Sequence, residues 1–112
     1  MPVIDPATFK ELKQMSGDDF INELIDTFLD DAPKMIAEIQ TAWKAKDADV
    51  FRRAAHSMKS NANTFGATEL AALAKELEIL GKEQKLEACW DKLRALEEAY
   101  ASVRDELKGL KS

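Results

Sequence analysis

The sequence predicts an all-α protein: an antiparallel up-down four-helix bundle with a short extra helix at the N-terminus. Apolar residues recur every three or four positions along most of the chain, which is the period of an amphipathic helix. Only four Gly and three Pro occur among the 112 residues, so few positions break helices. The polar segments between the apolar stripes are short, and short connections place successive helices antiparallel.

The short N-terminal helix is expected to begin at Asp5 and Pro6. Aspartate is a favoured N-cap residue, and proline is favoured at the first helical position. The helix should continue to about Met15 and stop at Gly17, because glycine readily takes the left-handed conformation that ends a helix.

A long helical segment follows, capped by Asp18 or Ser16. Pro33 interrupts its apolar stripe, where a proline removes one backbone hydrogen bond and clashes with the carbonyl of Leu29, at a cost of about 3 kcal/mol. Two alternatives stay open. The segment is one bent helix, or it is two helices, the second restarting at Pro33 with one of the two preceding aspartates as its cap.

Three more helices are expected. The first covers residues 48–64 and is ended by Gly66, the second covers 67–80 and is ended by Gly81, and the last covers 86–108. The apolar stripes of the long helices predict a bundle core that contains Leu24, Phe28, Ile39, Phe51, Met58, Leu73, Leu77, Trp90 and Leu93.

Composition and length indicate one folded domain over residues 1–112. Hydrophobic residues make up 46% of the chain and charged residues 33%, which favours a globular protein over disorder. The net charge of -5 argues against nucleic acid as a partner, since phosphate backbones require a broad basic surface. Cys89 has no second cysteine to pair with and is expected as a buried small hydrophobe in a reducing compartment. Without a signal segment or a long apolar run, the protein is expected to be cytoplasmic and not membrane-bound.

His56 is the only histidine, and it lies on the polar face of the helix predicted over 48–64. At about 100° per residue, its side chain points about 140° away from Phe51 on the apolar stripe. We therefore expect an exposed imidazole. Its neighbours one or two turns away are all polar: Arg52, Lys59, Ser60 and Asn63. The side chains of Ser60 and Asn63 are short enough to let a partner's active site approach.

The surroundings of His56 favour phosphoryl chemistry. Residues 50–68 contain three cations and no acidic residue, so the histidine lies in a positive island of an acidic chain. An imidazole with an ordinary pKa of about 6.5 keeps a nucleophilic lone pair at neutral pH and can form a covalent intermediate. The Lys59 ammonium can stabilise charge on phosphoryl oxygens, with Arg52 a second candidate. The pattern predicts a protein that carries a phosphoryl group on His56.

The sequence lacks features that an autonomous enzyme would need. There is no Gly-rich phosphate loop, and one histidine with one cysteine offers no metal site. The sequence around His56 also offers no acidic residue to orient its ring. We therefore expect neither a cofactor nor catalysis by the chain alone, with the partner supplying the catalytic groups and any Mg²⁺.

Residues 56–66, HSMKSNANTFG, resemble the signature of histidine-containing phosphotransfer (HPt) domains, in which five residues separate His-x-x-Lys-Gly from a second Gly. The resemblance extends over about 100 residues and includes segments 28–33 and 70–78. One position departs from the pattern, because Ser60 stands where many members have Gly.

The resemblance implies a four-helix bundle whose histidine accepts a phosphoryl group from the aspartate of a response-regulator receiver domain and passes it to another receiver. His56 would be the phospho-acceptor, on Nε2, Lys59 would contact the phosphoryl oxygens, and Gly66 would end the helix. The partner would be a receiver domain or a hybrid sensor kinase. We expect a monomeric, free-standing bacterial module of a two-component phosphorelay. Contacts to the partner are expected from Arg52, Ser60 and Asn63.

Two other function classes make different demands on the surface. A non-phosphorylated helical adaptor would bind its partner through exposed apolar anchors, and the helix around His56 offers only polar groups there. An autonomous enzyme would need a second catalytic group close to His56, and the sequence indicates none. Both are therefore disfavoured.

Overall fold

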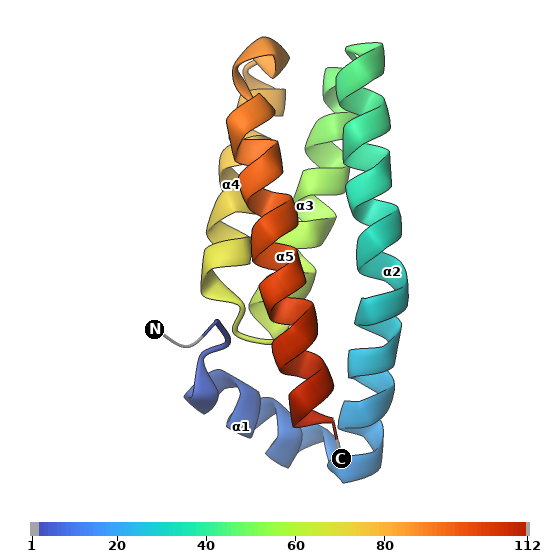
Figure 1. The fold of residues 1–112 in the computed structure, drawn as a ribbon, viewed down its shortest axis with the longest axis vertical. Coiled ribbons are helices and arrows are strands. Elements are labelled where there is room, and N and C mark those ends of the chain that lie inside the picture. Colours follow the sequence, from blue (N-terminus) through green and yellow to red (C-terminus); the bar gives the residue numbers. More distant parts are fainter. Residues whose placement is uncertain (1–2, 112) are drawn as a thin grey trace.

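Residues 3–111, which the computed structural model describes, fold into five α-helices, four of them packed side by side as an antiparallel bundle (Figure 1). The four are α2 (Asp18–Ala45), α3 (Ala48–Thr64), α4 (Thr68–Lys82) and α5 (Trp90–Leu110). Helix α5 lies beside both α4 and α2, which closes the bundle. The predicted up-down architecture is confirmed. Within these residues no helix has the length and apolar character that crossing a bilayer requires.

The predicted short N-terminal helix is present as α1 (Pro6–Ser16), and it crosses one end of the bundle (Figure 1). Asp5 precedes it, and its carboxylate accepts a hydrogen bond from the Thr8 hydroxyl at 2.6 Å. Gly17 ends the helix with a φ of 86°. The Asp5 N–H also donates to the Gly66 carbonyl at 2.8 Å, which ties the start of α1 to the turn between α3 and α4.

Helix α2 continues through Pro33, so the alternative of two helices is wrong. Pro33 is exposed, and its ring lies on the solvent side. Burial of the opposite face offsets the cost of about 3 kcal/mol that an interior proline carries. The predicted side-chain cap is also wrong: Gly17 precedes α2, and Ser16 instead donates to the Leu12 carbonyl at 2.6 Å. The buried face keeps its spacing on both sides of the proline, with Ile21, Ile25, Phe28, Ala32, Ile36, Ile39 and Ala42.

Most of the predicted core is confirmed. Leu24 and Leu73 are only partly buried and pack at the edge of the core. Trp90 is not a core residue, contrary to the prediction: it is 48% exposed and packs at the surface against Trp43, with ring centroids 5.1 Å apart. Cys89 is buried, as expected. The other predicted members are buried: Phe28, Ile39, Phe51, Met58, Leu77 and Leu93.

The last predicted helix is interrupted at Cys89. A 3-10 turn, η1 (Leu86–Ala88), precedes the break, and α5 begins at Trp90. In a continuous helix the Leu86 carbonyl would accept from the Trp90 N–H. Here it accepts instead from the Trp43 indole N–H at 2.9 Å, and from the Cys89 N–H and thiol at 3.2 and 2.8 Å. Because these donors occupy the Leu86 carbonyl, the helix breaks there. The break fixes the rotation of α5 about its axis, which turns Trp90 outward.

Gly81 does not end α4, contrary to the sequence prediction, and lies inside the helix where α4 packs closely on α3. A Cβ atom on Gly81 would lie 3.0 Å from Cδ1 of Phe51 and 3.1 Å from Cβ of Arg52. The missing side chain therefore allows α3 and α4 to approach each other.

We expect Gly81→Ala to lower the free energy of unfolding by about 1–3 kcal/mol through overpacking, although alanine favours helix by about 1 kcal/mol. Gly109→Ala is the matched control, because a Cβ on this α5 glycine meets nothing within 4 Å. The control should gain up to about 1 kcal/mol. Urea unfolding of both variants checks this, and equal gains in stability would contradict close packing at Gly81.

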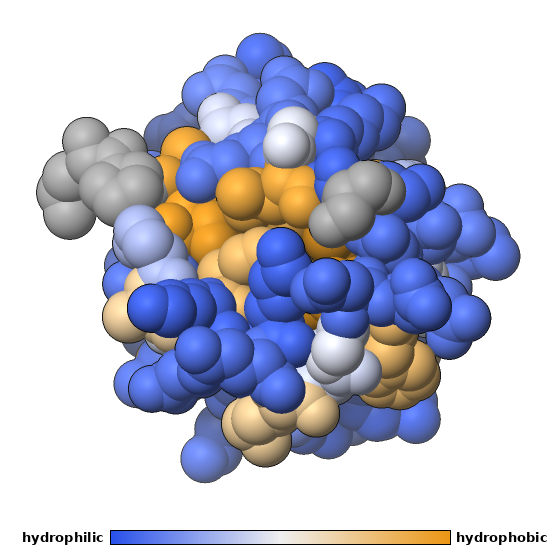
Figure 2. Space-filling model, turned by 90° about the horizontal axis from the view of Figure 1, so that it is seen from below, coloured by the Kyte–Doolittle hydropathy of each residue, from blue (hydrophilic) through white to orange (hydrophobic). Residues whose placement is uncertain are grey.

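The end of the bundle that α1 crosses exposes apolar side chains within a polar rim (Figure 2). Met15 is 86% exposed, Phe20 51% and Leu110 39%. A groove of about 330 Å³ lies there, and Ile4, Phe9 and Leu110 are among its lining residues. His56 lies midway along α3, so this apolar end is separate from the histidine.

Candidate functional site

His56 is held on a regular helix with its side chain 55% exposed. Asp47 starts α3 by accepting a hydrogen bond from the Val50 N–H at 3.2 Å, as the cap position predicts. The opposite face of α3 is buried and includes Phe51 and Met58. Because the apolar face fixes the rotation of the helix, the imidazole must point outward. The predicted exposure of His56 is confirmed.

A glutamate from the neighbouring helix contacts the histidine. Glu78 lies on α4, and its Oε2 is 2.7 Å from His56 Nδ1, while its Oε1 is 2.7 Å from Lys59 Nζ. The side chain of Glu78 is only 19% exposed and that of Lys59 26%. One carboxylate therefore joins the imidazole to the ammonium. The expectation that no acidic residue orients the ring is wrong, because the acid comes from another helix.

The protonation of this group follows from its partners. Burial raises the pKa of Glu78, but the hydrogen bonds and charges of Lys59 and His56 outweigh burial and hold that pKa below its ordinary value. An ionised carboxylate only accepts hydrogen bonds, so the Nδ1 atom of a neutral His56 ring must carry the proton. Nε2 then keeps the lone pair, and it has no hydrogen-bond partner within residues 3–111.

Gly66 ends α3 as predicted and sets the turn that brings α4 back along it. Its φ is 75°, its N–H donates to the Asn63 carbonyl at 3.1 Å, and the next N–H, of Ala67, donates to the Ala62 carbonyl at 2.9 Å. A Cβ on Gly66 would also lie 2.8 Å from Cβ of Thr8. The turn thus needs glycine both for its backbone conformation and for its contact with α1.

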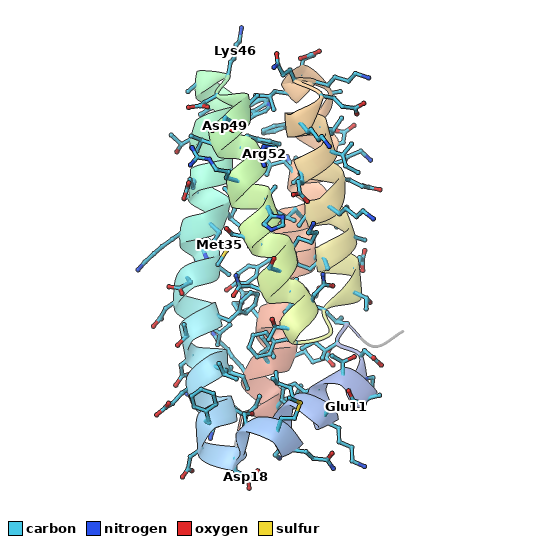
Figure 3. All side chains as sticks on the ribbon, turned by 180° about the vertical axis from the view of Figure 1, so that it is seen from behind. Glu11, Asp18, Met35, Lys46, Asp49 and Arg52 are labelled. Carbon is cyan, nitrogen blue, oxygen red and sulfur yellow. The ribbon has the colours of Figure 1, made fainter. Side chains whose placement is uncertain are left out.

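Arg52, Ser60 and Asn63 share α3 with His56 but, within residues 3–111, form no hydrogen bond or ion pair with its ring. Ser60 and Asn63 are exposed. Arg52 pairs with Asp49 at 3.0 Å, and Arg53 pairs with the same carboxylate at 3.1 Å. Figure 3 shows Arg52 and Asp49 on α3, towards the end of the bundle marked by Lys46.

The positive island is therefore partly offset by acids in the fold. Asp49 lies just outside the segment 50–68 and pairs with both of its arginines, while Glu78 pairs with Lys59, so the three cations face two carboxylates. In the described part of the chain, no group of three or more His, Cys, Asp and Glu side chains is placed to hold a metal ion. The arrangement offers one oriented nucleophile beside an ammonium, open to solvent.

Comparison with known families decides what kind of domain this is. Residues 23–106 match the Hpt domain, and these residues include all of α3 and α4. The chain belongs to the Hpt domain family. The resemblance seen in the HSMKSNANTFG segment is confirmed, and the two helices that carry His56 and Glu78 lie within the matched Hpt region.

Individual relatives agree with the Hpt assignment. The crystal structure of histidine-containing phosphotransfer protein B (HptB) from Pseudomonas aeruginosa PAO1 is 29% identical, with a TM-score of 0.93 over 98% of this chain and 95% of that chain. Sensory/regulatory protein RpfC from two strains of Xanthomonas campestris pv. campestris is 27% identical over 107 residues. The match covers 94% of this Hpt domain but only 15% of RpfC, so the chain spans a small part of these curated relatives.

Proposed function

We propose that this Hpt domain is a phosphorelay intermediate in which His56 accepts a phosphoryl group from a receiver-domain aspartate and passes it to a second receiver. The observation that carries the proposal is the exposed imidazole whose Nδ1 is held by an ionised carboxylate, leaving Nε2 with a lone pair. The similarity to HptB, a histidine-containing phosphotransfer protein, and to RpfC, a sensory/regulatory protein, supports a role in signalling.

The transfer needs one bond to form and one to break. The Nε2 lone pair of His56 attacks phosphorus, the N–P bond forms, and the bond between phosphorus and the aspartyl oxygen breaks, with its electron pair remaining on the aspartate carboxylate. Positive charge develops on the ring, and Glu78 offsets it while keeping the proton on Nδ1. The Lys59 ammonium has further N–H donors besides the one that Glu78 accepts, and these can contact phosphoryl oxygens. Transfer to the second receiver is the reverse reaction.

In this proposal the chain carries the group and the receiver supplies the catalytic residues and Mg²⁺. The domain would act as a monomer, in keeping with a transient complex with each receiver in turn. Ser60 and Asn63 are exposed on the face of His56 and leave space for the incoming active site, and Arg52 adjoins it one turn away.

The test is the transfer of labelled phosphate. A receiver domain charged from [³²P]acetyl phosphate is mixed with this chain, and the two proteins are separated. We expect label on this chain that is stable in base and lost in acid, as an N–P bond requires, and that maps to the peptide containing His56. Acid-stable label, or no label from any receiver of the same genome, would contradict the proposal.

A parallel incubation of the pure chain with [γ-³²P]ATP separates a carrier from an enzyme. We expect no incorporation, because the sequence has no nucleotide loop. Self-labelling with ATP would show that the chain is a kinase in its own right.

A further inference from the structure

A surface on α4 beside His56 has no role in the proposed phosphoryl transfer itself. It forms a depression of about 380 Å³ next to Glu78. Its α4 residues are spaced by three or four positions and so form one stripe along the helix. Ile79, within this stripe, is 44% exposed, which is unusual for a large apolar side chain of this protein. The lining residues are Arg52, Lys75, Glu78, Ile79 and Lys82.

The stripe is positive although the protein is acidic. Arg52 is paired with Asp49, and Glu78 is held between His56 and Lys59. Lys75 and Lys82 are exposed, and neither has an ionic or hydrogen-bond partner within residues 3–111. Two unpaired ammonium groups thus flank an exposed isoleucine, in a chain whose net charge is -5.

We propose that Lys75, Ile79 and Lys82 form the docking surface for the receiver domain. Ile79 enters an apolar recess of the receiver, and the two lysines pair with acidic residues around that recess. An apolar anchor surrounded by a charged rim is the usual composition of a specific protein interface. The inference rests on the proposed function and adds which face the partner covers and what chemistry the partner presents.

Position and charge both select this face. The stripe adjoins Glu78, so a receiver seated on it has its reacting group within reach of His56. The aspartyl phosphate is itself an anion, and unpaired cations steer a negatively charged partner towards the site. The helix around His56 has no exposed large apolar side chain, and Ile79 on the neighbouring α4 provides one.

The experiment compares docking variants with matched controls at the far end of the bundle. The docking variants are Lys75→Glu/Lys82→Glu and Ile79→Ala. The controls are Lys10→Glu/Lys108→Glu, which makes the same charge change on α1 and α5, and Met15→Ala, which removes an exposed apolar side chain. The donor is the ³²P-labelled receiver that charges the wild-type chain fastest, and transfer rates are measured against receiver concentration at two salt concentrations.

We expect the double charge reversal to raise the half-saturating receiver concentration about tenfold or more and to reverse its salt dependence, because salt then screens repulsion instead of attraction. Ile79→Ala should also raise it about tenfold but leave the salt dependence unchanged. The controls should behave as wild type. All variants should keep the wild-type circular dichroism spectrum, so that a change in the transfer rate cannot come from unfolding.

Docking variants that transfer like their controls would overturn the proposal. Equal losses in docking and control variants would overturn it too, because the effect would then follow net charge and not position. Failure of the wild-type chain to be labelled by any receiver would instead refute His56 as the acceptor, and the docking surface would fall with it.

Discussion

Replacing His56 with Gln should abolish phosphate transfer to this chain, reducing the label to the background of the assay. Glutamine has no nucleophilic nitrogen, because its amide lone pair is delocalised, and the chain contains no second histidine. The fold should be unaffected, since the side chain is 55% exposed and contributes nothing to the core. Substitutions at such exposed positions usually change the free energy of unfolding by less than about 0.5 kcal/mol.

Label transfer and circular dichroism together check this prediction. Ser60→Gly is a suitable control, because it changes the neighbouring turn of α3 to the residue that many Hpt domains have while keeping His56. We expect it to be labelled at least as fast as wild type. Base-stable, acid-labile label that persists in the His56→Gln variant would show that another nitrogen is the acceptor.

Glu78→Gln should slow labelling of His56 by roughly 10- to 100-fold. A hydrogen bond to a charged group contributes about 1.5–3 kcal/mol, and each 1.4 kcal/mol corresponds to a factor of about ten in rate. The amide lacks the charge that offsets the developing imidazolium, and it no longer favours the proton on Nδ1. Glu78 acts through the ring and is a positioning residue, so the rate alone is not a sufficient test.

Nitrogen NMR of the imidazole gives the independent measurement. In the wild-type chain the Nδ1–H tautomer should dominate in the neutral ring, and in Glu78→Gln the two tautomers should mix. Glu76→Gln is the matched control, since Glu76 lies on the same helix but pairs with Lys92 at 3.0 Å. An unchanged tautomer ratio in Glu78→Gln would contradict the positioning role even if the rate fell.

The same carboxylate should contribute to the acid sensitivity of the fold. The pKa of Glu78 is lower in the folded chain than its ordinary value of 4.5, owing to Lys59 and His56 against the opposing effect of burial. Its contribution to stability is therefore fully present above pH 4.5 and is lost as the pH falls through the folded pKa. The difference in unfolding free energy between wild type and Glu78→Gln should shrink over that acid range. A difference that does not change with pH would contradict the assignment.

The bounds of a helix could be predicted from the sequence where residues next to its ends determine them. Helix α3 has the predicted bounds, because Asp47 and Gly66 act on the backbone next to them. Contacts between helices decided the positions where the prediction failed. The break at Cys89 depends on the Trp43 indole, which is distant in sequence, and Gly81 is a packing contact with α3, where a glycine after an apolar stripe suggested a stop.

The candidate site shows the same difference between signals within one helix and contacts between helices. The exposure of His56 follows from the phase of a single helix, so periodicity was sufficient to predict it. Glu78 requires the register between two helices: α3 and α4 fold back at Gly66, which lies ten residues after His56 and twelve before Glu78. An antiparallel hairpin places such residues opposite each other, but α4 has other glutamates, and selecting one requires the rotation of α4 about its axis. Counting charges along the chain could not supply that rotation.

The position of Glu78 between His56 and Lys59 also affects how long His56 would stay phosphorylated. With a neutral ring, the glutamate and the lysine cancel each other, so the unloaded face is electrically balanced. In the proposed relay, a phosphoryl group on His56 would place negative charge close to the Glu78 carboxylate, with Lys59 as the cation that contacts both. Repulsion by the fixed carboxylate would then favour transfer of the group to the next receiver.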